Sequence, residues 1–197
     1  AILSKGGVFP EESEAVKAAN VIYQTTEDDY ADTIKPKLEA AGADCQRVGF
    51  ISDREQNLTL EDPRFGEAVR SMKAKLLIID PIQAFVPKDG NLYQASKMRM
   101  SMQRLSWIAE RYQCAILLIG HMTKSKNSKQ LYRGLGSIDI TASVRSVLMI
   151  TRDHLQPEIR YMFPVKSNIA IEGDAIGFIF TEMGFRWIGK CRINKDE

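Results

Sequence analysis

The stretch Lys75-Leu76-Leu77-Ile78-Ile79-Asp80 decides how the rest of this sequence is interpreted. A short aliphatic run bounded by polar residues is typical of a strand that is buried on both faces in the middle of a mostly parallel sheet. Sheets of this kind bind ligands beyond the carboxyl ends of their strands. Asp80 stands at such an end, where it either serves a ligand or begins the turn made by Pro81.

Two further predicted strands also run into polar side chains. Residues 20–26 are rich in β-forming residue types and lead into an acidic group that begins with Glu27. Residues 114–120 form a second apolar run, which predicts another fully buried strand, and His121 follows it directly. If the three strands are parallel neighbours, Glu27, Asp80 and His121 meet at one edge of the sheet.

These three residue types suit phosphoryl transfer from a nucleotide to water. An aspartate at the end of a buried strand holds the nucleotide's Mg²⁺ through the waters of the ion, which is the role predicted for Asp80. A carboxylate about one water away from the terminal phosphate orients the attacking water and accepts its proton, with Glu27 as first choice and Asp28 as second. His121 is placed to sense the terminal phosphate. Each residue also has a purely structural interpretation, as a turn former, a helix-start carboxylate or a hydrogen-bonded histidine.

Periodicity and turn residues predict the remaining elements. Helices are expected at 30–41, 63–74 and 93–113, with Asp62 capping the second, and residues 82–91 are expected to form a loop. In the third helix, Met98, Met102, Leu105, Ile108 and Ala109 repeat at helical spacing and are expected in the core. Further strands are expected at 47–51, 146–151, 159–165, 175–180 and 185–188, the last four as an antiparallel extension of the sheet.

Composition limits the class of protein. The 197 residues fit a single domain, 1–197, and 44% hydrophobic with 26% charged residues is usual for a soluble globular chain. No apolar run approaches the roughly 20 residues that span a bilayer, and no secretory signal is visible, so a cytoplasmic location without membrane partners is expected. Three widely spaced cysteines suggest neither disulfides nor a zinc site. With a net charge of +2, nucleic acid would have to bind to a local basic patch.

A phosphate-binding loop is missing from the sequence. The pattern G-x-x-x-x-G-K-[ST], whose backbone amides and lysine hold nucleotide phosphates, does not occur. The run Gly120-His121-Met122-Thr123-Lys124-Ser125 lacks the glycine before the lysine, and Gly134-Leu135-Gly136 lacks the third glycine of a dinucleotide fingerprint.

Taken together, the residues resemble the RecA-like ATPases, most closely the plasmid RepA-type branch of hexameric replicative helicases and its AAA-family relatives. The resemblance covers nearly the whole chain. It is carried by residues 23–29 with the helix that follows, by Leu76–Asp80, by Gly120-His121 and by Arg133-Gly134.

The resemblance implies a RecA-like three-layer α/β core with a mostly parallel central sheet and C-terminal antiparallel strands. It implies ATP and Mg²⁺ as cofactors, with Glu27 activating water, Asp80 serving Mg²⁺ and His121 sensing the γ-phosphate. It also implies a ring-shaped homo-oligomer, a hexamer in the full-length protein, in which Lys166 or Arg133 reaches the nucleotide at a subunit interface.

Two DNA-facing loops are implied as well, at 82–91 and 122–131. The second carries Lys124, Lys126 and Lys129, and lysines contact the phosphates of single-stranded or duplex DNA without reading sequence. A solvated lysine loop is the plain alternative.

The chain departs from the family at its front, where residues 1–5 match the end of the helix that follows the phosphate loop. We therefore expect the first strand and the phosphate loop to precede these residues, and the fragment alone to be inactive. The function expected is a DNA-associated motor ATPase, a replicative helicase of plasmid or mobile-element type. A regulatory or helicase-loading ATPase without unwinding activity, or a non-catalytic nucleic-acid-binding or assembly module, are the alternatives.

Overall fold

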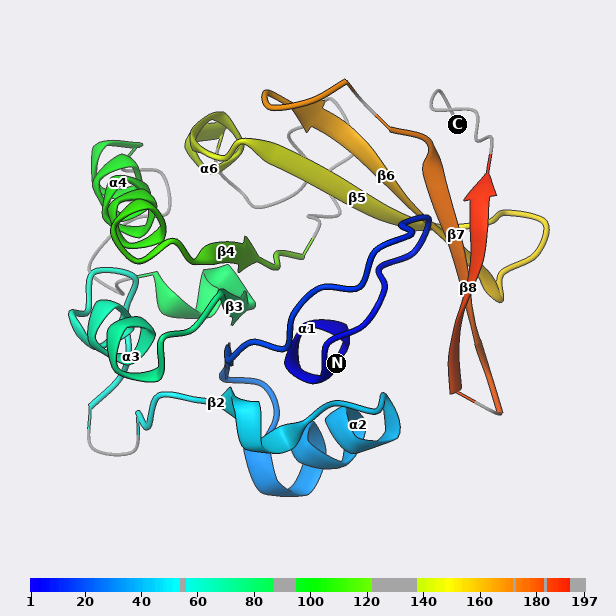
Figure 1. The fold of residues 1–197 in the computed structure, drawn as a ribbon. Helices are drawn as coiled ribbons and strands as arrows, with labels where there is room; N and C mark the ends of the chain where they lie inside the picture. The colour runs from blue at the N-terminus through cyan, green and yellow to red at the C-terminus, as the bar shows by residue number, and fades with distance from the viewer. Residues whose placement is uncertain (54–55, 87–94, 122–137, 172, 183, 192–197) are drawn as a thin grey trace. The chain divides into compact units, whose positions relative to one another are not determined.

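The computed structural model describes residues 1–53, 56–86, 95–121, 138–171, 173–182 and 184–191. The chain forms two compact units, one made of residues 1–7 and 16–143 and the other of residues 8–15 and 144–197. Each unit has its own four-stranded sheet (Figure 1). Among the described helices, none is both long and apolar enough to cross a membrane.

The first unit is built on a parallel sheet with the strand order β2-β1-β3-β4. Its strands are β1 (Val21–Thr25), β2 (Val48–Gly49), β3 (Leu76–Asp80) and β4 (Ala115–Leu118). The register pairs Thr25 with Asp80 and Ile79 with Leu118. Parallel pairing with β1 and β4 confirms β3 as the predicted central strand. Leu77 and Ile79 on one face of β3 have 0% exposure, whereas Leu76 and Ile78 on the other face are half-buried.

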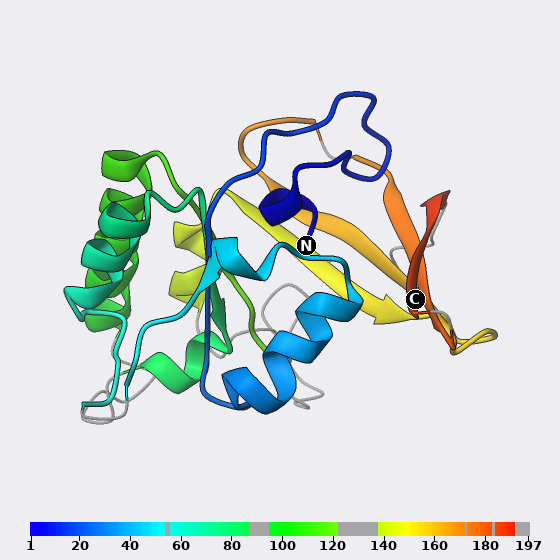
Figure 2. The ribbon, with the colours of Figure 1, turned by 60° about the horizontal axis from the view of Figure 1, so that its bottom comes forward.

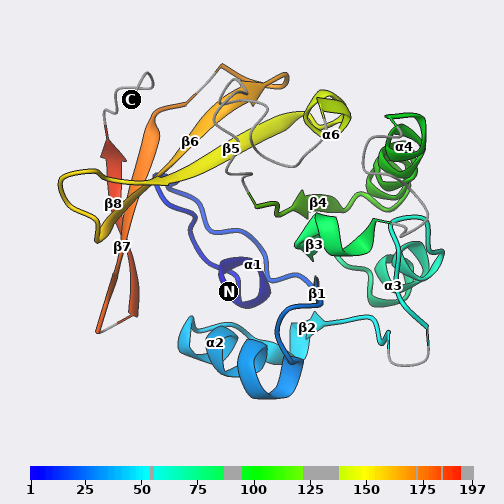
Figure 3. The ribbon, with the colours of Figure 1, turned by 180° about the vertical axis from the view of Figure 1, so that it is seen from behind.

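Helices flank this sheet on two sides. Figures 1 and 3 show α3 (Arg64–Met72) and α4 (Ala95–Tyr112) on one side, and α1 (Ile2–Lys5) and α2 (Lys35–Ala40) on the other. A further helix, α6 (Ile138–Ser143), packs against α4. Of the apolar residues predicted for the core side of α4, Ala109 is half-buried and the other four are buried, namely Met98, Met102, Leu105 and Ile108. The methionine pattern is therefore core packing, as predicted.

The predicted helix at 30–41 begins with a π-helical turn, Tyr30–Ile34, before α2. The backbone N–H of Ile34 donates to the carbonyl of Asp29, five residues back, at 3.1 Å. Pro36 has no backbone N–H and so makes no regular helical bond to the carbonyl four residues before it. A wider first turn accommodates this missing donor.

Two expectations about short segments were partly wrong. The strand expected at 47–51 pairs only through Val48–Gly49, and the ring of Phe50 is 52% exposed beside that of Tyr30. The loop expected at 82–91 begins as a 3₁₀ turn, Ile82–Phe85, whose Ile82 and Phe85 are fully buried. The beginning of that segment belongs to the core because two large apolar side chains occur three residues apart, which places them on the same side of a 3₁₀ turn. Residues 87–91 lie outside the described part.

Strand β4 differs most from its prediction. A fully buried strand was expected, but Leu117 is 45% exposed. Among the described residues, β4 pairs only with β3 and is therefore an edge strand with one free hydrogen-bonding ladder.

The second unit is an antiparallel sheet in the order β5-β6-β7-β8. The strands are β5 (Ser146–Arg152), β6 (Ile159–Ser167), β7 (Ala175–Thr181) and β8 (Gly184–Cys191), which confirms the four predicted strands (Figure 2). In the described residues they form a separate sheet and do not extend the parallel one. The rings of Phe178 and Trp187 pack across β7 and β8, with their centroids 5.7 Å apart.

Substitution of Phe85 tests whether the 3₁₀ turn contributes to the core. Its ring meets that of Phe65 edge to face, with centroids 6.2 Å apart. The substitution Phe85→Ala is expected to lower the free energy of unfolding by about 3–5 kcal/mol, because it removes a fully buried aromatic ring and leaves a cavity. Urea denaturation measures this. Met100→Ala on the exposed side of α4 is the control, and equal losses in the two variants would contradict the assignment.

Candidate functional site

The parallel register brings the three predicted catalytic residues to the same edge of the first sheet. Asp80 is the last residue of β3, and Glu27 and His121 lie in the segments that leave β1 and β4. The Nε2 atom of His121 lies 3.4 Å from Oε1 of Glu27. These side chains are 65% and 57% exposed, respectively, so they meet where a ligand from solvent can reach them.

Asp80 is held by a residue for which the sequence predicted no role. The hydroxyl of Tyr23, on β1, donates a hydrogen bond of 2.6 Å to Oδ2 of Asp80. Partial burial raises the pKa of Tyr23 well above its ordinary value, and the hydrogen bond and negative charge of Asp80 act in the same direction. The charges of Asp28 and Glu27 add to this rise in pKa. Tyr23 therefore remains a protonated donor at neutral pH.

The three consecutive acidic residues after β1 have different partners. Asp29 caps the π-helical turn, since its Oδ1 accepts from the backbone N–H groups of Ala31 and Asp32 at 2.8 and 3.0 Å. Asp28 forms an ion pair of 2.8 Å with Lys37. Within the described part of the chain, Glu27 is the one of the three that contacts His121. The geometry therefore favours Glu27, the first choice as base, over Asp28.

The end of β4 is tied to the 3₁₀ turn that follows β3. The backbone N–H of Ile82 donates to the carbonyl of Ile119 at 2.8 Å. The side-chain amide of Gln83 donates to the carbonyl of His121 at 3.4 Å. In the described residues, Oε1 of Gln83 is buried without a hydrogen-bond partner. The predicted phosphate sensor is thus linked to the start of the predicted DNA-facing segment.

The other predicted site residues are not brought to this edge by any described contact. On β6, Lys166 donates from Nζ to the carbonyl of Val144 at 2.8 Å, a bond within the second unit. The remaining predicted cations, Arg133, Lys124, Lys126 and Lys129, lie outside the described residues. Their roles remain predictions.

The carboxylates at this edge of the sheet suit a Mg²⁺ ion that binds together with a nucleotide. Within the described residues there is no group of three or more histidine, cysteine or acidic side chains that could enclose an ion. Mg²⁺ needs no such enclosure, because it keeps several waters and is usually held by one or two carboxylates together with the substrate's phosphates. Asp80 can supply that carboxylate.

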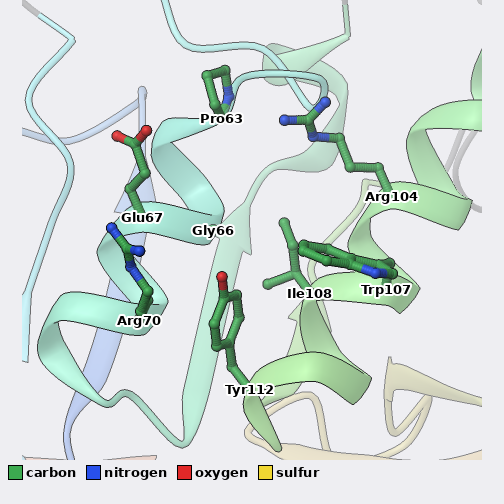
Figure 4. A pocket seen from close by; sticks show the side chains of 8 residues that line it. All are labelled: Pro63, Gly66, Glu67, Arg70, Arg104, Trp107, Ile108 and Tyr112. Atoms are coloured by element: carbon green, nitrogen blue, oxygen red, sulfur yellow. The ribbon is translucent and has the colours of Figure 1, made fainter.

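A groove of about 480 Å³ lies between α3 and α4. Figure 4 shows its lining, with Glu67 and Arg70 on α3 and Trp107 and Tyr112 on α4. None of the three predicted catalytic residues lines this groove. The strand-end cluster is therefore a different place on the molecule.

A parallel sheet that gathers an aspartate, a glutamate and a histidine at its carboxyl edge is the arrangement expected of a RecA-like ATPase fold. Two solved structures share this fold. The RadB recombinase is 16% identical, with a TM-score of 0.58 over 85% of this chain and 78% of that one. The second structure is the ATPase domain of another protein, which is 11% identical, with a TM-score of 0.66 over 87% of this chain and 74% of that one. The predicted fold class is confirmed.

The family follows from the sequence itself. A family model described as an AAA domain matches residues 1–127, and the chain belongs to that family. A search of curated proteins found no match.

The structural roles assigned to Asp29, as a cap, and to Asp28, as an exposed ion-pair partner, can be tested by substitution. Asp29→Ala is expected to lower the free energy of unfolding by about 0.5–2 kcal/mol, because two backbone donors lose their acceptor. Asp28→Asn is expected to cost less than about 1 kcal/mol, since an exposed ion pair contributes little. Chemical denaturation of both variants measures the difference. A larger loss of unfolding free energy for Asp28→Asn than for Asp29→Ala would contradict these roles.

Proposed function

We propose that this chain is the core of an ATP-dependent, DNA-associated motor ATPase, a replicative helicase of the plasmid RepA type. In this proposal it works as a ring-shaped homo-oligomer, a hexamer, with ATP and Mg²⁺ at the subunit interfaces. The observation that carries the proposal is the 3.4 Å contact between Glu27, after β1, and His121, after β4. Asp80 ends β3, the strand that lies between these two. Membership of the AAA domain family supports it.

Each residue of the cluster has a task in hydrolysis. Glu27 orients the attacking water and accepts its proton. Asp80 holds the waters of the nucleotide's Mg²⁺, and bound Mg²⁺ supplies positive charge against the phosphates. His121 binds either Glu27 or the terminal phosphate with Nε2, since a single ring nitrogen does not serve both. Exchange of His121 from Glu27 to the phosphate would leave Glu27 free to hold water only when a triphosphate is bound.

The phosphates also need backbone donors, which the sequence does not provide in a glycine-rich loop. We propose that a strand carrying such a loop pairs with the free edge of β4. Leu117 is exposed, and within the described residues β4 has one paired ladder. Both support this pairing, because an apolar edge strand gains burial and hydrogen bonds from a further neighbour. Activity is therefore to be measured with such a strand and loop present.

The cations and the DNA-facing segments complete the proposal. Lys166 or Arg133 would approach the nucleotide of a neighbouring subunit and offset charge in the transition state. For Lys166 this requires its Nζ to leave the carbonyl of Val144. Gln83, near the start of the predicted DNA-facing loop 82–91, donates to the carbonyl of His121, and this contact would give the sensor a short path to that loop.

The assignment of Glu27 as the base is tested by Glu27→Gln. The rate of ATP hydrolysis is expected to fall about 10²- to 10⁴-fold, because glutamine cannot accept the proton of the attacking water. Nucleotide affinity is expected to stay close to wild type, since the change is isosteric. Steady-state hydrolysis and titration with a fluorescent nucleotide measure the two. Glu39→Gln on α2, an exposed carboxylate paired with Lys35, is the matched control. Hydrolysis at the wild-type rate in Glu27→Gln would exclude the proposed mechanism.

The lysine segment is tested by replacing Lys124, Lys126 and Lys129 together with alanine. Affinity for single-stranded DNA is expected to fall equally for all sequences. The slope of log affinity against log salt is expected to become shallower by about 2, because each lost phosphate contact removes about 0.7 from it. Filter binding at several salt concentrations measures both, with the exposed Lys35→Ala as control.

An unchanged salt slope in the triple variant would overturn the assignment of this segment to DNA. A strand-displacement assay on the same preparations then separates a helicase from an ATPase that binds DNA without unwinding it.

A further inference from the structure

Tyr23 is a polar residue within the first sheet for which the proposed mechanism has no use. Its hydroxyl contacts Oδ2 of Asp80 at 2.6 Å, within the short range of an O–H donor facing a carboxylate. The two residues come from adjacent strands. Tyr23 pairs with Ile78 in the register, and Thr25 pairs with Asp80, so both aromatic ring and carboxylate stand on the same face.

A second tyrosine–aspartate hydrogen bond, between Tyr161 and Asp153, serves as an example of a pair with a purely structural role. Tyr161 donates to Oδ2 of Asp153, also at 2.6 Å. Oδ1 of that aspartate is occupied, because it accepts from the backbone N–H groups of Leu155 and Gln156 at 2.8 Å each. Both oxygens of Asp153 therefore serve the turn after β5.

Asp80 is different from Asp153 in this respect. Among the described residues, Tyr23 is its one hydrogen-bond donor, and it reaches Oδ2 alone. Oδ1 is left to accept from a ligand. A carboxylate held by one oxygen cannot rotate freely about its terminal bond, so the other oxygen keeps a fixed direction.

We propose that Tyr23 is a positioning residue for Asp80, whose hydroxyl fixes the carboxylate through Oδ2 so that Oδ1 receives the waters of the nucleotide's Mg²⁺. This inference rests on the proposed function of Asp80. Groups that hydrogen-bond a metal-binding carboxylate orient it, and their loss typically weakens metal binding or activity about 10- to 100-fold.

The test is Tyr23→Phe in the complete natural protein, with Mn²⁺ as the probe. Mn²⁺ binding in the presence of a non-hydrolysable ATP analogue is measured by the loss of the free-ion EPR signal. The dissociation constant is expected to rise about tenfold or more. The Mg²⁺ concentration for half-maximal ATP hydrolysis should rise with it, whereas nucleotide affinity without metal should not change. A purely structural loss would not move the metal dependence selectively.

Tyr161→Phe is the matched control, because it removes a hydroxyl from the same kind of pair at an aspartate with no proposed ligand. Its Mn²⁺ affinity is expected to equal that of wild type. Circular dichroism and the unfolding temperature show that both variants are folded. In an Asp80→Asn background, addition of Tyr23→Phe should change Mn²⁺ affinity no further, as expected for two residues that act through one contact.

Two failures are distinguishable. Wild-type Mn²⁺ affinity in Tyr23→Phe, or equal losses in Tyr23→Phe and Tyr161→Phe, would overturn the positioning role and leave the proposed function standing. A wild-type protein that neither binds Mn²⁺ with nucleotide nor hydrolyses ATP would overturn the proposed function itself.

Discussion

Parallel pairing of β3 with β1 on one side and β4 on the other is the constraint on which the candidate site depends. Parallel strands end at the same edge, so two residues far apart in the sequence, Glu27 and His121, come within 3.4 Å of each other. The pairing is stabilised by burial of Leu77 and Ile79, which lie on one face of the central strand and are fully shielded from water. Apolar burial thus sets the position of polar groups that make no contact with the core.

At that edge, local hydrogen bonding decides which acidic residue is available. A cap at Asp29 fixes the start of the π-helical turn, and Lys37 on α2 pairs with Asp28. Both interactions satisfy charges or backbone donors within the chain. Glu27 is the carboxylate of the three that faces another strand end, which is what a residue that acts on a ligand requires.

The sequence predicted this edge well because its evidence was local. An apolar run that ends in Asp80 and another that ends before His121 are visible as patterns within about six residues. The exposure of Leu117 was not predictable in the same way, since whether an apolar strand is central or at an edge depends on the order of strands in the sheet. Tyr23 was missed for a related reason, because its contact with Asp80 depends on the register between β1 and β3.

The contact between His121, the predicted sensor, and the 3₁₀ turn after β3 follows from the same packing. Ile82 and Phe85 are fully buried, and the carbonyl of Phe85 accepts from the N–H of Leu60 at 2.8 Å, so the 3₁₀ turn is anchored in the core and resists displacement as a unit. A response at His121, the predicted sensor, would therefore act through the hydrogen bonds that join the end of β4 to this turn. Gln83 has the required contact, and its buried Oε1 gains a partner in any arrangement that offers a donor, a gain of order 1–3 kcal/mol.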